Sequence, residues 1–105
     1  KLEDSNGNDV TDQVLHLPKV FLIFSYNPDK MNETDKNTID HIEELTINNN
    51  KVYGISTKPN VFPSVENLTM DGTAIKTIAR SNPFVLVLEN GKIVEKKSLE
   101  DFLDK

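Results

Sequence analysis

Side chains that carry out chemistry are scarce in this chain. Its 105 residues include no cysteine and two histidines, His16 and His41. Without cysteine there is no disulfide, no thiolate ligand for a metal and no thiol nucleophile. Asp40 and Glu44 lie close to His41 in the sequence, but a metal site needs several ligands that converge on one point. A solvated histidine on an acidic helix is the simpler interpretation, and we expect neither a metal nor a cofactor.

Hydroxyl nucleophiles and phosphate-binding loops are equally poorly supported. Ser25 and Ser56 lie near the ends of predicted strands, but neither occupies the glycine-flanked turn that exposes the nucleophile of hydrolases. The four glycines are isolated from one another, which excludes a glycine-rich phosphate loop. They are Gly7, Gly54, Gly72 and Gly91. The sequence contains no recognisable catalytic constellation, and we expect that the chain alone is not an enzyme.

Length and charge exclude further functions. A chain of this length fits one domain. Lys and Arg number 12 against 17 Asp and Glu, so the net charge is −5. An acidic chain without a basic stripe is a poor binder of nucleic acid. No apolar run approaches the roughly eighteen residues of a membrane span, so we expect no membrane insertion of this segment. The chain begins at Lys1 without an initiator methionine, which favours a piece of a longer polypeptide or a processed chain.

The elements that must position any site follow from apolar runs and turn signals. Residues 20–24 and 84–88 are each five consecutive apolar residues, as in strands covered on both faces. Asn90-Gly91 is a strong hairpin signal. Residues 57–70 are expected to be irregular. The predicted elements are a strand at 20–24, a helix at 32–48, a strand at 51–56, a helix at 72–80 capped by Asp71, strands at 84–88 and 93–96, and a short helix capped by Ser98.

This order is β-α-β followed by α-β-β-α, which predicts an α/β fold. The first half requires parallel strands joined by a helical crossover, and the second half ends in an antiparallel hairpin. We therefore expect a mixed four-stranded sheet with helices on both faces. Residues 1–18 are predicted to form an N-terminal extension that packs on a domain of residues 19–105.

The order of elements resembles the minimal thioredoxin fold over residues 19–105. Strand 20–24 runs into a loop and a long helix, where thioredoxins carry their redox loop. Pro83 follows Asn82 directly before strand 84–88, where that family keeps a cis-proline, and the hairpin at Asn90-Gly91 is similar to the family's last two strands. The opening stretch, residues 6–11, resembles the leading segment of extracytoplasmic thioredoxin-like domains. The resemblance thus implies an extracytoplasmic location.

The chain departs from the family at the redox loop. Thioredoxins hold a Cys-x-x-Cys pair at the start of their first long helix, where the helix end stabilises a thiolate. Here residues 27–32 are Asn-Pro-Asp-Lys-Met-Asn, which contain no thiol. The reductase, isomerase and peroxidase activities of the family therefore do not carry over.

A second resemblance concerns residues 76–83, Lys-Thr-Ile-Ala-Arg-Ser-Asn-Pro, followed by an apolar strand and Asn90-Gly91-Lys92. This stretch is similar to the soluble thioredoxin-like domain that follows the membrane-spanning part of some bacterial DoxX-family proteins. It implies that the chain belongs to a larger, membrane-tethered bacterial protein.

Together these features predict a redox-inactive binding domain whose partner is a protein or an extended peptide, including the membrane part of the same protein. An extended segment is expected to add as a strand beside Pro83, and the connection at residues 57–59 borders the same groove. Alternatively, the proline is kept only because the turn requires it. Two further hypotheses are a component of a thiol–disulfide or respiratory redox system, with its reactive groups on a partner or elsewhere in the full chain, and a purely structural appendage. The predicted groove residues are Tyr26, Asn27, Pro28, Asp29, Met31, Ser81, Asn82 and Pro83.

Overall fold

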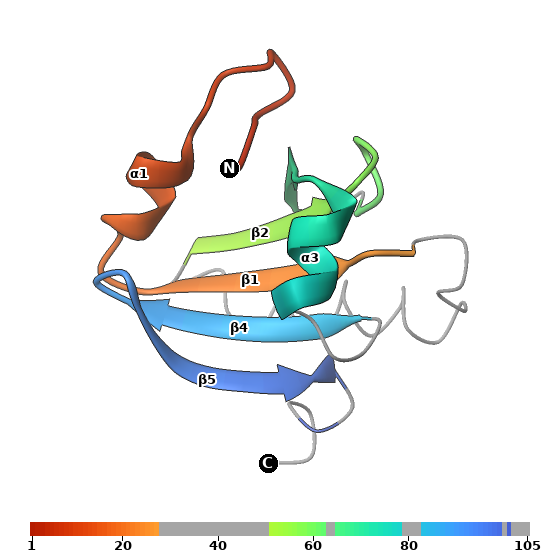
Figure 1. Ribbon diagram of the computed structural model, residues 1–105. Coiled ribbons are helices and arrows are strands. Elements are labelled where there is room, and N and C mark those ends of the chain that lie inside the picture. Colours follow the sequence, from red (N-terminus) through yellow and green to blue (C-terminus); the bar gives the residue numbers. More distant parts are fainter. Residues whose placement is uncertain (28–50, 63–64, 79–82, 100, 102–105) are drawn as a thin grey trace.

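The computed structural model describes residues 1–27, 51–62, 65–78, 83–99 and 101 (Figure 1). The predicted helix at residues 32–48 lies outside these ranges. Among the described residues there are two helices and five strands. In chain order they are α1 (Thr11–Leu15), β1 (Val20–Ser25), β2 (Lys51–Ser56), β3 (Glu66–Thr69), α3 (Gly72–Ile78), β4 (Phe84–Glu89) and β5 (Lys92–Ser98).

The strands form one mixed sheet in the order β3-β2-β1-β4-β5. β1 lies in the centre, parallel to β2 and antiparallel to β4 (Figure 1). All six residues of β1 are buried, because an apolar strand in the centre of a sheet is covered on both faces. The predicted α/β class, with a parallel first half and an antiparallel second half, is confirmed.

The prediction of four strands was wrong, because β3 adds a fifth within the stretch expected to be irregular. It pairs in parallel with β2, with Leu68 opposite Ile55. Its four residues include one buried apolar side chain, Leu68, so there is no alternating pattern to detect. The strand forms because β2 offers it an edge, which is a tertiary cause that local sequence does not record.

The predicted hairpin is confirmed, with both turn residues in the left-handed region. Asn90 has φ of 51° and Gly91 has φ of 81°, the combination that suits a two-residue turn between twisted strands. The ladder contains a bulge, since Val87 pairs with Glu95 but Leu88 pairs with Ile93. Val94 is therefore an extra residue on β5.

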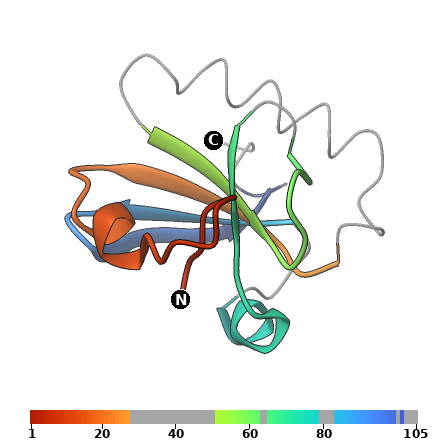
Figure 2. The same ribbon diagram turned by 90° about the horizontal axis from the view of Figure 1, so that it is seen from above.

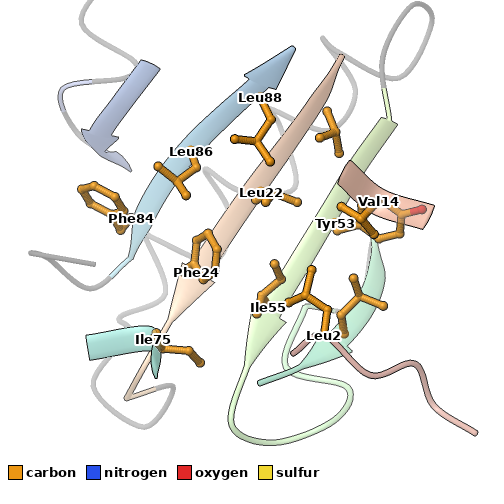
Figure 3. Close-up of a cluster of buried hydrophobic side chains, with 12 residues drawn as sticks. Leu2, Val14, Leu22, Phe24, Tyr53, Ile55, Ile75, Phe84, Leu86 and Leu88 are labelled. Carbon is orange, nitrogen blue, oxygen red and sulfur yellow. The ribbon is translucent and has the colours of Figure 1, made fainter. Parts of the chain in front are cut away.

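The two faces of the sheet carry separate apolar cores. Figure 3 shows the larger core, to which α1 contributes Val14 and α3 contributes Ile75. Both helices lie on this side of the sheet (Figure 2). The core of the opposite face includes Ile23, Phe62 and Val87. Neither described helix, with five residues in α1 and seven in α3, has the length of a membrane span.

The N-terminal segment is tied to the sheet by hydrogen bonds. The backbone N–H of Glu3 donates to the carbonyl of Thr69 at 3.0 Å, and the N–H of Thr69 donates to the carbonyl of Glu3 at 2.8 Å. The N–H of Leu2 donates to Oγ1 of Thr11 at 2.8 Å, and the Leu2 side chain is buried in the larger core. Leu2 and Glu3 thus attach the start of the chain to the sheet, while the division into an extension of residues 1–18 and a domain of residues 19–105 stays a prediction.

A tight turn precedes α1. Oδ1 of Asp4 accepts hydrogen bonds from the N–H groups of Asn6 and Asn8, each at 2.9 Å. These bonds lower the pKa of the Asp4 carboxyl from its ordinary value of 3.8, and the bond from the N–H of Asn8 contributes most.

The helix cap predicted at Asp71 is confirmed, since its Oδ2 accepts from the N–H of Ala74 at 3.3 Å in the first turn of α3. Oγ of Ser98 accepts from the N–H of Asp101 at 3.1 Å, the bond expected of a cap, while most of the helix predicted there lies outside the described residues.

Candidate functional site

Three chain segments meet where β1 and β2 end and β4 begins. Ser25, the last residue of β1, lies opposite Ser56, the last residue of β2. On the other side of β1, Phe24 lies opposite Phe84, the first residue of β4. The residues after Ser25, those after Ser56 and the residue before Phe84 therefore share one edge of the sheet. Binding sites of open α/β sheets form at such carboxyl ends of parallel strands.

Three of the predicted groove residues lie in the part of the chain that the structure describes. Tyr26 and Asn27 directly follow β1, and Pro83 directly precedes β4, so the register brings these three to the same edge. The other predicted groove residues lie outside the described residues: Pro28, Asp29, Met31, Ser81 and Asn82. The isomer of the Asn82–Pro83 bond stays a prediction.

The Tyr26 side chain is half-buried and packs against the larger core. Nζ of Lys76, on α3, lies 5.9 Å from the centroid of the Tyr26 ring, within the range of a cation–π interaction. This contact joins residues fifty positions apart, so no local pattern predicts it. It places a cation and an aromatic face at the edge where the predicted groove begins.

Two hydroxyl groups lie beneath this edge. The side chains of Ser25 and Ser56 are both buried, and Oγ of Ser56 has no hydrogen-bond partner among the residues that the structure describes. His16 follows α1 and precedes β1, so it lies at the end of β1 opposite to Ser25, and its ring Nδ1 is 2.6 Å from the carbonyl oxygen of Asp12. His16 is therefore not placed to activate either serine. His41 lies outside the described residues.

The ends of β2 and β3 line a cavity of about 270 Å³ at the same edge of the sheet. Thr57 follows β2 and Met70 and Asp71 follow β3, while Glu3 enters from the N-terminal segment. Among the described residues, none of the predicted groove residues lines this cavity, so the prediction that residues 57–59 border the groove stays a prediction. No group of three or more potential metal ligands occurs within the described ranges.

Comparisons with known proteins identify the fold. No family model and no curated protein matches the chain. A conserved protein of unknown function from Bacteroides fragilis is 18% identical, with a TM-score of 0.66 over 98% of this chain and 90% of its own. An exposed lipoprotein thioredoxin from Streptococcus pneumoniae is 16% identical, with a TM-score of 0.65 over 98% and 93%. The thioredoxin domain of a thiol-disulfide oxidoreductase from Bacteroides vulgatus is 15% identical, with a TM-score of 0.65 over 97% and 88%.

These similarities show that the chain has a thioredoxin-like fold. Beyond this edge the chain continues into residues 28–50, which lie outside the described residues, so their correspondence to a redox loop stays a prediction. Since the whole sequence has no cysteine, this thioredoxin-like domain has no thiol of its own at that edge.

Proposed function

We propose that this chain is a redox-inactive thioredoxin-like domain that binds an extended segment of another polypeptide. The binding site is the edge where β1 and β2 end and β4 begins. One observation supports this most directly: the pairing of β1 with β4 brings Tyr26, Asn27 and Pro83 to one edge of the sheet, although the chain contains no cysteine. Without a thiol no mixed disulfide can form, so a partner at this edge is held by non-covalent contacts alone.

The groups at this edge suit an extended chain. Tyr26 offers an aromatic face, and the Lys76 ammonium beside it attracts carbonyl oxygens and acidic side chains. The carbonyl of Pro83 already accepts a hydrogen bond from the N–H of Leu99 at 3.3 Å, on the side of β5. We assign the backbone groups that a bound segment would use for strand addition to Ser81 and Asn82, next to this carbonyl.

Peptide binding followed by NMR tests the proposal. The isotope-labelled domain is titrated with a panel of unstructured decapeptides. The panel includes cysteine-containing peptides and the same peptides with each cysteine replaced by serine. We expect amide shifts at Tyr26, Asn27 and the residues next to Pro83. Lys76→Gln is expected to weaken binding about threefold, because it removes the cation over Tyr26.

Lys19→Gln is the matched control, because Nζ of Lys19 lies 5.6 Å from the ring of Phe21, away from the proposed groove. It should leave peptide affinity unchanged. Shifts that avoid this edge with every peptide would contradict the proposal.

A second candidate is a component of a thiol–disulfide or respiratory redox system whose reactive groups lie on a partner or elsewhere in the full chain. It is favoured by fold neighbours that are described as thiol-disulfide oxidoreductases. Both candidates predict that the isolated domain fails to reduce insulin. Thiol turnover that appears only in the intact complex, and is lost with Lys76→Gln, would favour this second candidate.

The proposal extends to the setting of the domain. We propose that the domain lies outside the cytoplasm and is tethered to a membrane through a DoxX-type segment of the same protein. Supporting this are the resemblance of residues 76–83 and the exposed lipoprotein among the fold neighbours. The sequence of the complete gene product tests the tether: membrane helices before Lys1 support it, and a secretion signal alone argues for a free domain.

A further inference from the structure

An apolar cavity of about 220 Å³ lies on the sheet face that carries α1 and α3. Its floor is formed by Leu86 and Leu88, which follow one another along β4, and by Leu22 on the neighbouring strand β1 (Figure 3). Leu15 of α1 and Ile93 of β5 border it as well. This cavity lies over the face of the sheet, whereas the proposed peptide groove lies along the ends of its strands.

Apolar side chains that are exposed to water gather around this cavity. Within the described part of the chain the exposed large hydrophobic residues are Leu15, Val94 and Ile93, with 38%, 51% and 58% of their surfaces accessible. Two of the three, Leu15 and Ile93, line the cavity. Scattered exposed apolar residues need no explanation, but a cluster beside an apolar hollow is typical of a docking site.

The bulge in β5 determines which side chains face the cavity. Cross-strand partners in an antiparallel ladder point to the same face. Ile93 pairs with Leu88 and Lys96 pairs with Leu86, so both lie on the face of the cavity. Val94 is the extra residue of the bulge and does not line the cavity.

Positive charge borders the apolar surface. Lys97, on the opposite face, forms an ion pair with Glu95 at 3.2 Å, whereas Lys96 has no ion pair among the residues that the structure describes. The side chain of Lys1 also borders the cavity, and its ammonium lies 3.8 Å from Glu3. Lys96 does not itself line the cavity, but it lies on the same face, directly across the ladder from the lining residue Leu86. An apolar hollow with cations beside it is complementary to an apolar side chain that has acidic neighbours.

We propose that this cavity binds a partner polypeptide through one large aliphatic or aromatic side chain flanked by acidic residues. The volume favours a single anchoring side chain, because pockets for drug-sized ligands begin at about 300 Å³. Anchors of this kind dominate the affinity of protein interfaces. Among the described residues, Tyr26, Asn27 and Pro83 do not line this cavity, so binding at the two sites can be followed through different residues.

The residues at the margin of the cavity are already held in place in the unbound domain. The N–H of Asn90 donates to the carbonyl of Pro18 at 3.2 Å, which holds the hairpin turn against the segment after α1. Gly91 packs so closely that a Cβ there would lie 3.1 Å from the carbonyl oxygen of Leu15. The two walls that carry Leu15 and Ile93 are thus joined, and binding need not order them.

The test uses a synthetic nonapeptide with phenylalanine at its centre and two aspartates on each side, at concentrations up to about 1 mM. Calorimetry and methyl NMR should show binding with shifts at Leu15, Leu88 and Ile93. A peptide with central alanine and one with lysines in place of the aspartates should each bind at least about tenfold more weakly.

Matched variants of β5 distinguish the loss of a cavity contact from a general disturbance of the strand. Ile93→Ser should weaken binding about tenfold, whereas Val94→Ser, an equally exposed substitution one residue away, should change it less than about twofold. Lys96→Glu should weaken binding more than Lys97→Glu, which lies on the opposite face. Far-UV circular dichroism confirms that each variant is folded.

Three results would overturn the proposal. The first is no binding of the phenylalanine peptide, and the second is equal loss in Ile93→Ser and Val94→Ser. The third is a dimer in sedimentation that Ile93→Ser converts to monomer, because the occupant would then be a second copy of this chain. The groove at Tyr26 is tested separately, because its peptide titration is followed through amide shifts at Tyr26, Asn27 and the residues next to Pro83.

Discussion

Replacing Gly54 with alanine tests how closely the second core is packed. Gly54 lies in β2 on the same face as Phe62, and a Cβ added there would lie 2.8 Å from Cβ of Phe62 and closer still to its ring. Such distances are not tolerated, so Phe62 must move. Phe62 is 2% exposed, and its backbone is fixed at both ends by Asn67, through Phe62 N–H to Oδ1 at 2.9 Å and Nδ2 to the Phe62 carbonyl at 2.7 Å.

We expect Gly54→Ala to lower the free energy of unfolding by about 2 kcal/mol, the middle of the range for overpacked cores. In a domain of this size that corresponds to a fall in Tm of roughly 8–16 °C. Because the chain has no tryptophan, unfolding in urea and by heat is followed by far-UV circular dichroism. Gly72→Ala is the control: its Cβ would meet only Cγ2 of Thr57, at 3.2 Å, and alanine suits a helix better than glycine.

A double-mutant cycle identifies the cause. Phe62→Leu alone is expected to cost about 1 kcal/mol. Combined with Gly54→Ala, it should recover about 1 kcal/mol relative to the sum of the single changes, since the smaller side chain leaves room for the new methyl group. If Gly54→Ala unfolds with the wild-type midpoint, or if the two changes are simply additive, the close approach of Phe62 does not limit this core.

Three further changes have defined outcomes. Asn67→Ala should lower the free energy of unfolding by about 2–3 kcal/mol in urea, because it removes both bonds to the backbone of Phe62 and leaves those groups unpaired; a loss under about 0.5 kcal/mol would contradict this. Gly91→Ala should lower the free energy of unfolding by about 1–2 kcal/mol in the same assay, because alanine is strained at φ of 81° and its Cβ would press on Leu15. Unchanged stability would refute the close packing of the hairpin turn.

The lowered pKa of Asp4 means that its contribution to the N-terminal turn is fully present above about pH 3.8 and is lost as the pH falls through the folded value. The protection of the Asn6 and Asn8 amides, measured as the exchange rate relative to an unfolded peptide at the same pH, should therefore fall in that acid range. In Asp4→Ala this protection should be lost at neutral pH as well, and unchanged protection would contradict the role of Asp4.

The three strands at the centre of the sheet were predictable to within a residue, two of them from continuous apolar runs. β1, β2 and β4 match their predicted bounds closely, and the hairpin follows from Asn90-Gly91, whose backbone conformation other residues rarely adopt. β3 was missed because Leu68 alone marks it. The bulge at Val94 was missed because a bulge is a property of the paired ladder and leaves no signal in one strand.

The site was predictable only in outline. The resemblance to thioredoxins pointed to Tyr26, Asn27 and Pro83, and the strand register brings these three to one edge. The cation of Lys76 over Tyr26 and the hydroxyl of Ser56, unpaired among the described residues, depend on how distant segments pack, which single-sequence patterns do not contain. The apolar cavity was missed for the same reason, because its walls come from strands and a helix far apart in the chain.

The pairing of Glu3 with Thr69 affects how copies of this domain behave at high concentration. An open sheet has two outer strands, and unsatisfied backbone groups along them invite stacking into aggregates. At β3 the N-terminal segment takes up the backbone donor and acceptor of Thr69. At β5 the bulge and the charges of Lys92, Lys96 and Lys97 discourage pairing with a second chain. Removing residues 1–10 would therefore expose β3 and should promote aggregation before it unfolds the sheet.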